Sequence, residues 1–187
     1  MKNLILILLF LSPMFAQMSD AQTRKSETEN SITEETKKIA FKNSVKVKEI
    51  GQQSIYKAVK KWTNKNYNKD IFYSNIINDK KNFSVRITSR VKLLINDKVK
   101  PLLFYTMDIK CDKGEYVATI SDLLFEYDNP EGKKSHSKIE AEKIISNEGK
   151  DNQINYIQNP ETFYKSTRFF VDNTFEDLLQ FVKSNVR

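Results

Sequence analysis

Alternation of apolar and polar side chains is the clearest pattern in this chain. It is strongest over residues 83–93, and it recurs over residues 39–48, 102–111 and 115–127. A period of two is typical of strands that bury one face and expose the other to water. We therefore expect four strands in these stretches. A fifth strand is expected over residues 71–77, which are rich in Ile, Phe and Tyr.

Two other segments carry apolar residues at spacings of three, four and seven, which predicts amphipathic helices. One covers residues 54–67, and a longer one begins at Asn159-Pro160-Glu161. A short element is expected over residues 139–145, inside a turn-rich insertion at about 128–160. The order β-α-β-β-β-β-α then predicts an α+β domain. Its two helices cover one face of an antiparallel sheet of about five strands.

The first helix and the hairpin near residue 114 also carry a family likeness. Tyr56 and Trp62 stand six residues apart in the helix, and the turn reads Asp112-Lys113-Gly114 before Glu115. In these features the chain resembles a family of secreted bacterial domains of unknown function with a fold like that of the TATA-binding protein (TBP). The turn departs from the family pattern by one inserted residue and a missing Arg. The resemblance implies a TBP-like fold and an envelope setting. It brings no catalytic residues, and a shared fold does not transfer DNA binding.

Pairing Asp112 with Glu115 sets the expected register of the hairpin over residues 102–127. In that register Tyr105 and Asp122 lie opposite each other on the buried face, so Asp122 cannot act together with Asp108 on the outer face. Four large apolar side chains then point outward and form a candidate interaction patch. Either the 128–160 insertion or a partner must cover this patch, because it is costly to leave wet. Its members are Leu102, Phe104, Leu123 and Phe125.

The outer face of the predicted sheet is also basic, and the whole chain carries a formal net charge of +7. These side chains form either an ordinary solvated surface or a platform for an anionic partner. Lys110 joins them on the same face, with Asp108 among them. The candidate polyanion-binding residues are Lys42, Lys46, Lys48, Arg86, Arg90 and Lys92.

The N-terminal segment predicts export. Residues 1–16 combine Lys2, an unbroken apolar run and a small residue at Ala16, as in a signal peptide cleaved after Ala16. The run is too short for a membrane anchor, so no transmembrane span is expected after cleavage. Residues 17–36 are polar and predict a disordered leader, and residues 37–187 form the single domain. A secreted or periplasmic location argues against nucleic acid and favours an envelope protein or an anionic polymer as partner.

Several classes of site are excluded by the residue counts. The four glycines form no nucleotide-binding loop, and neither Cys111 nor His136 has a second residue of its kind for a metal or redox pair. No catalytic residue, cofactor or metal site is therefore expected. We interpret the chain as an exported, non-catalytic binding domain of the bacterial cell envelope. The alternatives are polyanion or nucleic-acid binding through the basic face, and a hydrolase with an unrecognised site, which loss of an activity on replacing Asp108 would support.

Overall fold

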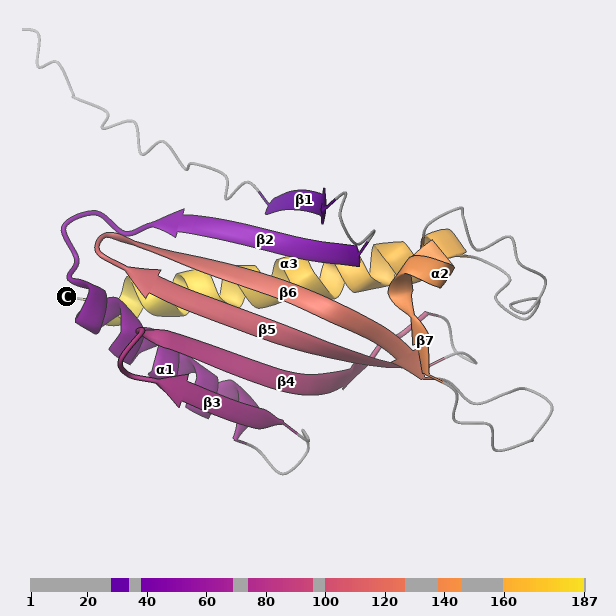
Figure 1. Ribbon diagram of the computed structural model, residues 1–187, viewed down its shortest axis with the longest axis horizontal. Coiled ribbons are helices and arrows are strands. Elements are labelled where there is room, and N and C mark those ends of the chain that lie inside the picture. The colour runs from indigo at the N-terminus through magenta and orange to yellow at the C-terminus, as the bar shows by residue number, and fades with distance from the viewer. Residues whose placement is uncertain are drawn as a thin grey trace, which may run out of the picture.

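The protein is built around one antiparallel sheet with its helices on a single side (Figure 1). The computed structural model describes residues 28–33, 38–68, 74–95, 100–126, 138–145 and 160–186. The strand order is β1-β2-β6-β5-β4-β3, and β7 pairs with β6 beyond the end of β2. The elements are β1 (Thr28–Thr33), β2 (Lys38–Lys46), α1 (Gln52–Tyr67), β3 (Asn75–Asp79), β4 (Ser84–Lys92), β5 (Leu102–Asp112), β6 (Glu115–Glu126), β7 (Lys138–Glu140), α2 (Ala141–Ile145) and α3 (Pro160–Asn185).

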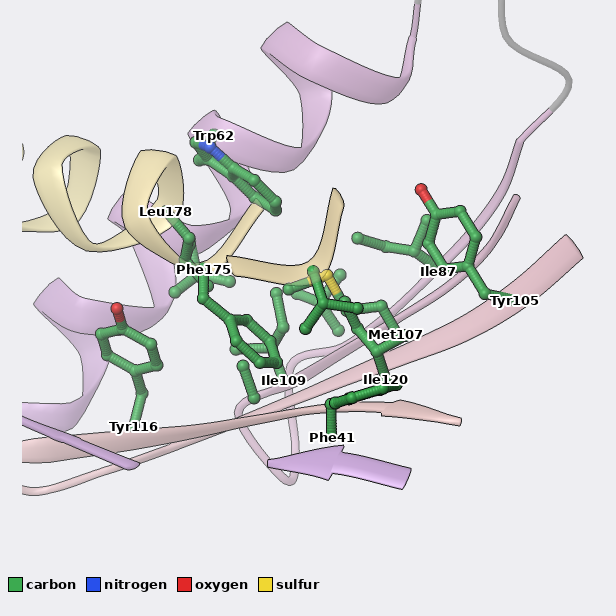
Figure 2. Packing of buried hydrophobic residues seen from close by; sticks show 14 of the residues in the cluster. Phe41, Trp62, Ile87, Tyr105, Met107, Ile109, Tyr116, Ile120, Phe175 and Leu178 are labelled. Carbon is green, nitrogen blue, oxygen red and sulfur yellow. The ribbon is translucent and has the colours of Figure 1, made fainter. Parts of the chain in front are cut away.

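The predicted α+β fold is confirmed, with both long helices on one face of the sheet. Every second residue of β5 is buried, and so is every second residue of β2 from Phe41 and of β4 up to Ser89, as the alternation predicted. Figure 2 shows Trp62 of α1 and Phe175 and Leu178 of α3 above strand residues such as Ile109 and Ile120. These five side chains are at most 3% exposed. The core therefore lies between the helices and one face of the sheet, and no described helix covers the other face.

The β5–β6 hairpin begins in the predicted register, with Asp112 opposite Glu115 and Gly114 in the turn at a φ of 75°. The register then shifts: Thr106 faces Ser121, but Phe104 faces Leu124. Two β6 residues therefore stand opposite one on β5, which is a β-bulge. Asp122 adopts a φ of 53° at this point, a left-handed conformation that Asp tolerates better than most residues.

The bulge corrects part of the predicted register. Leu123 and Phe125, expected on the outer face, are 1% and 0% exposed and lie in the core. Asp122, expected on the buried face, is exposed. The physical reason is the extra residue, which rotates the rest of β6 by one position and exchanges its two faces. Tyr105, which the expected register placed opposite Asp122 on the buried face, instead donates from its hydroxyl to the Tyr67 hydroxyl at 3.3 Å.

The N-terminal edge of the sheet also differs from expectation. Residues 28–33 form β1 against β2, although the polar leader was predicted to be disordered. Strand pairing uses main-chain groups, so a polar segment can extend a sheet edge without an apolar face. β3 begins at Asn75, and the first part of the predicted 71–77 strand lies outside the described residues. Residues 1–16, predicted to be a signal peptide, and His136 also lie outside them.

The short element predicted inside the insertion is present as β7 followed by α2. Ala141 and Ile144 of α2 are buried, and the Glu142 carboxylate accepts a hydrogen bond from the Ile39 main-chain N–H at 2.6 Å. α2 thus holds the first residues of β2 beside β6. Among the helices in the described ranges, none has the length and apolar character needed to cross a membrane.

Candidate functional site

The outer face of the sheet is the first candidate site, because its side chains point away from both long helices. Cross-strand pairing arranges them in rows. One row runs from β2 to β4 through Lys42, Thr119, Asp108 and Arg86. Thr106 and Ser121 form a second pair beside it. The middle of the face therefore carries hydroxyl groups together with the Asp108 carboxylate, and basic side chains flank it on β2 and β4.

All six predicted basic residues are exposed. Five of them occupy outward positions of β2 or β4, and Lys48 lies in the turn that follows β2. The strands β2 and β4 are separated by β6 and β5, so the two groups of cations stand about 14 Å apart, at roughly 4.8 Å per strand. The five strand residues are Lys42, Lys46, Arg86, Arg90 and Lys92.

Ion pairs neutralise part of this surface. The Arg86 guanidinium donates to both oxygens of Asp108, at 2.7 and 3.1 Å. That pair raises the pKa of Arg86, and the nearby charge of Asp122 raises it further. Within the described residues, Lys42, Lys46 and Lys92 make no ion pair. The positive potential of the face therefore comes mainly from lysines.

The predicted positions of the carboxylates Asp108 and Asp122 also need correction. Asp108 and Asp122 were expected on opposite faces, but the bulge brings both charges to the surroundings of Arg86. Asp122 also lies 3.7 Å from the Lys38 ammonium. Both carboxylates are about half exposed and each faces a cation. This is the environment of surface ion pairs, and it lacks the burial that tunes a carboxylic acid for general acid–base catalysis.

The predicted apolar patch is reduced by the bulge. Leu102 and Phe104 remain on the outer face and are half-buried. The Lys138 ammonium stands 3.9 Å from the centroid of the Phe104 ring, and the Arg90 guanidinium stands 5.9 Å from it. Phe125 instead packs edge-on against Phe163 of α3, with centroids 5.3 Å apart. Of the predicted apolar patch, two residues are therefore in the core, and the Phe104 ring on the outer face is covered by the side chains of Lys138 and Arg90.

A cavity on the helix side of the sheet was not predicted from the sequence. It has a volume of about 790 Å³ and lies on the helix side, between the C-terminal half of α1, the end of β4 and the first half of α3. Its lining is mainly apolar and aromatic, and two of its large apolar side chains are largely exposed. They are Leu94 at 72% and Phe169 at 71%. The other aromatic residues that line it are Trp62, Tyr67, Tyr105 and Phe170.

The polar groups of this cavity are mostly satisfied within the protein. The Asp177 carboxylate accepts from the Trp62 indole N–H at 2.6 Å and from the Asn66 side-chain amide at 3.2 Å. Burial raises the pKa of both Tyr67 and Tyr105, so both phenols are neutral at physiological pH. No sequence signal marks the cavity, because its walls come from three segments far apart in the chain. The pair Phe169-Phe170 on α3 is the nearest hint, since an exposed helix position rarely carries Phe.

No metal centre is found in the part of the chain that the structure describes. No group of three or more His, Cys, Asp or Glu residues there is arranged to hold an ion. Burial raises the pKa of the Cys111 thiol to about 12, so this side chain behaves as a small apolar group. These observations leave the outer sheet face and the cavity as the two candidate sites.

Comparison with known proteins agrees with the fold described above. Residues 41–126 match the model of a family described as "Domain of unknown function (DUF4468) with TBP-like fold". The crystal structure of a TBP-like protein from Parabacteroides distasonis is similar, with 33% sequence identity and a TM-score of 0.72 over 80% of this chain and 95% of that one. A DUF4468 family protein from Bacteroides ovatus shares the fold at 17% identity, with a TM-score of 0.64 over 78% of this chain and 86% of that one. No curated protein matches the sequence.

Proposed function

This chain belongs to the family of domains of unknown function with a TBP-like fold (DUF4468), and from that premise we propose that it is an exported, non-catalytic binding domain of the bacterial cell envelope. Its ligand is an anionic polymer held on the outer face of the sheet. The family supplies no activity, so the proposal rests on the surface chemistry of the described residues.

One observation carries this proposal: lysines that make no ion pair within the described residues stand on both sides of a central strip of the outer face, where the Asp108 carboxylate is already paired with Arg86. Thr106, Thr119 and Ser121 lie in the strip, with Lys42 and Lys92 on the flanking strands. Successive outward positions on a strand are about 7 Å apart. An extended polyanion lying along the strip meets cations on both sides and hydroxyl donors beneath it. The sheet fixes the main-chain positions of these lysines, so only their side chains must be ordered when the polymer binds.

The N-terminal sequence supports the envelope setting. Residues 1–16 have the pattern of a signal peptide, and export separates the protein from genomic DNA. Fractionating cells and measuring the intact mass of the protein tests this part. A mass lacking residues 1–16, recovered outside the cytoplasm, is the expected result. A full-length cytoplasmic protein would overturn it and make nucleic acid the leading ligand of the same face.

Binding to dextran sulfate, with uncharged dextran as the reference, tests the ligand class. The double substitution Lys42→Gln/Lys46→Gln removes two cations from the face. The matched control Lys57→Gln/Lys60→Gln removes two exposed lysines from α1, on the other side of the sheet. Because each cation that contacts the polymer releases counterions on binding, the first variant is expected to bind at least tenfold more weakly. It should also have a shallower salt dependence, by about one to two in log–log slope.

The outcomes separate a specific face from general charge. Equal losses in both double variants would mean that net charge alone drives binding, and the sheet-face proposal would be wrong. An absence of binding at low salt would also remove it. Tighter binding of single-stranded DNA than of dextran sulfate at equal charge would support the nucleic-acid alternative instead.

A further inference from the structure

The helix-side cavity has the features of a ligand site that the proposed function does not use. From its apolar walls and basic rim, we propose that this cavity binds an anionic amphiphile, a molecule with an unbranched hydrocarbon chain and one negatively charged head group. The hydrocarbon chain would lie against the aromatic walls near Trp62 and Phe170. The head group would lie among the basic residues of the rim.

The size and lining of the cavity support an apolar body. A volume of about 790 Å³ falls within the range of about 300 to 1,000 Å³ that small-molecule sites occupy. Leu94 and Phe169 line it and are 72% and 71% exposed. Covering apolar surface gains roughly 25 cal/mol per Å², so these two side chains are stabilised when a hydrocarbon chain packs against them. Phe169 lies within α3, which places this part of the apolar wall on a regular helix.

The charges around the cavity favour an anion over a cation. Lys165 on α3 lines it, and so do Arg90 and Lys92. The last two are at outward positions of β4, but β3 pairs with β4 only as far as Thr88, so they stand at the open edge of the strand, between the outer face and the cavity. The only acidic residue in its described lining is Asp177, whose carboxylate already accepts two hydrogen bonds, from Trp62 and Asn66. Lys165 pairs with Glu161 at 2.7 Å, but both side chains are more than 70% exposed. Exposed pairs of this kind are weak, so an arriving carboxylate or phosphate can compete for the lysine.

The protein contains its own reporter for this site. Trp62 is the single tryptophan of the chain, and it lines the cavity. Titrating dodecanoate, below the concentration at which it forms micelles, should therefore change Trp62 fluorescence in a saturable way. Dodecyltrimethylammonium, which has the same chain length and the opposite charge, is the matched probe. We expect it to bind at least tenfold more weakly.

Two substitutions and their controls test the location. Phe169→Ser removes an exposed wall residue and should weaken dodecanoate binding at least tenfold, whereas Ile77→Ser, at an exposed position on β3, should leave it unchanged. Lys165→Gln should reduce the preference for the anionic probe about threefold or more. Lys183→Gln, near the other end of α3, should not. Lys42→Gln/Lys46→Gln should also have no effect, so the cavity and the sheet face are tested separately.

Several results would overturn the proposal. Equal affinity for the anionic and cationic probes would indicate non-specific detergent binding. A loss of circular dichroism in parallel with the fluorescence change would indicate unfolding by the probe. If the protein were dimeric and Phe169→Ser made it monomeric, a second copy of the chain would be the occupant of this apolar surface.

Discussion

The bulge at Asp122 makes a quantitative prediction that separates two arrangements of β6. Replacing Phe125 by Ala should destabilise the protein by about 3–5 kcal/mol, which is typical for truncating a buried phenylalanine. Phe125 is fully buried. Its edge-on contact with Phe163, at 5.3 Å and 86°, supplies about 1 kcal/mol of that loss. Without the bulge, Phe125 would lie on the outer face and its removal would cost little.

The matched control is Phe104, an aromatic residue on the neighbouring strand that stays on the outer face. It is half-buried beneath Lys138 and Arg90. Truncation to Ala loses the buried half of the ring and its two cation–π contacts. Together these losses should lower the free energy of unfolding by about 1–2 kcal/mol. The adjacent pair Leu123 and Leu124 gives a second contrast, because Leu123 is 1% exposed and Leu124 is half-buried.

Urea unfolding followed by Trp62 fluorescence measures these differences. Trp62 is buried in the native state, so its emission changes when the core opens. With a slope of about 2 kcal/mol per molar urea, Phe125→Ala should lower the midpoint by about 2 M. Phe104→Ala should lower it by less than about 1 M. Equal shifts for the two variants, or a larger loss for Leu124→Ala than for Leu123→Ala, would refute the bulged register.

Three further predictions concern single groups. Asp122→Gly should leave stability unchanged or raise it by up to about 1 kcal/mol in thermal unfolding, because glycine adopts a φ of 53° without strain; a clear loss would mean that its charge outweighs its backbone. Cys111, whose pKa burial raises to about 12, should react with a thiol reagent at pH 8 only in denaturant; fast labelling of the native protein would contradict its burial. Hydrogen bonds from the Asn82 side chain and main chain lower the pKa of Asp79 in the folded protein. The ionised carboxylate therefore stabilises the fold at pH values above its unfolded pKa of about 4. This stabilisation is lost as the pH falls through the lower pKa of the folded state. Asp79→Asn should thus be less stable than the parent at pH 7, with the gap closing near pH 2; a constant gap would refute this.

The alternation in the sequence was sufficient to predict β4 and β5, since every second residue is buried from Val85 to Ser89 of β4 and throughout β5. It failed in β6 because a bulge is a main-chain event. The residues Asp122, Leu123 and Leu124 fit a regular strand as well as a bulged one, and only packing against α3 distinguishes them. β1 was missed for a related reason, because its pairing with β2 uses main-chain hydrogen bonds that leave no apolar pattern.

The two candidate sites differ in how much of each could be predicted. The basic face was predictable, because outward positions such as Lys42 and Arg90 follow directly from strand periodicity. The ion pair that neutralises Arg86 follows from the cross-strand register, which places Asp108 opposite it. The cavity was not predictable, because it depends on how far α3 stands from the end of β4. Trp62 is a core residue by spacing and by burial, and nothing in its local sequence indicates that it also lines a cavity.

The strand order has a consequence for the order of folding. β3, β4, β5 and β6 pair with their neighbours in sequence, but β2 pairs with β6, where Phe41 meets Ile120 across a separation of 79 residues. Closing a long loop costs more conformational entropy than closing a hairpin. We therefore expect the β3–β6 meander to form first and β2 to dock last. When the chain is synthesised or exported from its N-terminus, β2 appears well before β6. Until β6 follows, the apolar side chains of β2 remain exposed and its main chain has no central partner, so this strand is where we expect a chaperone to bind.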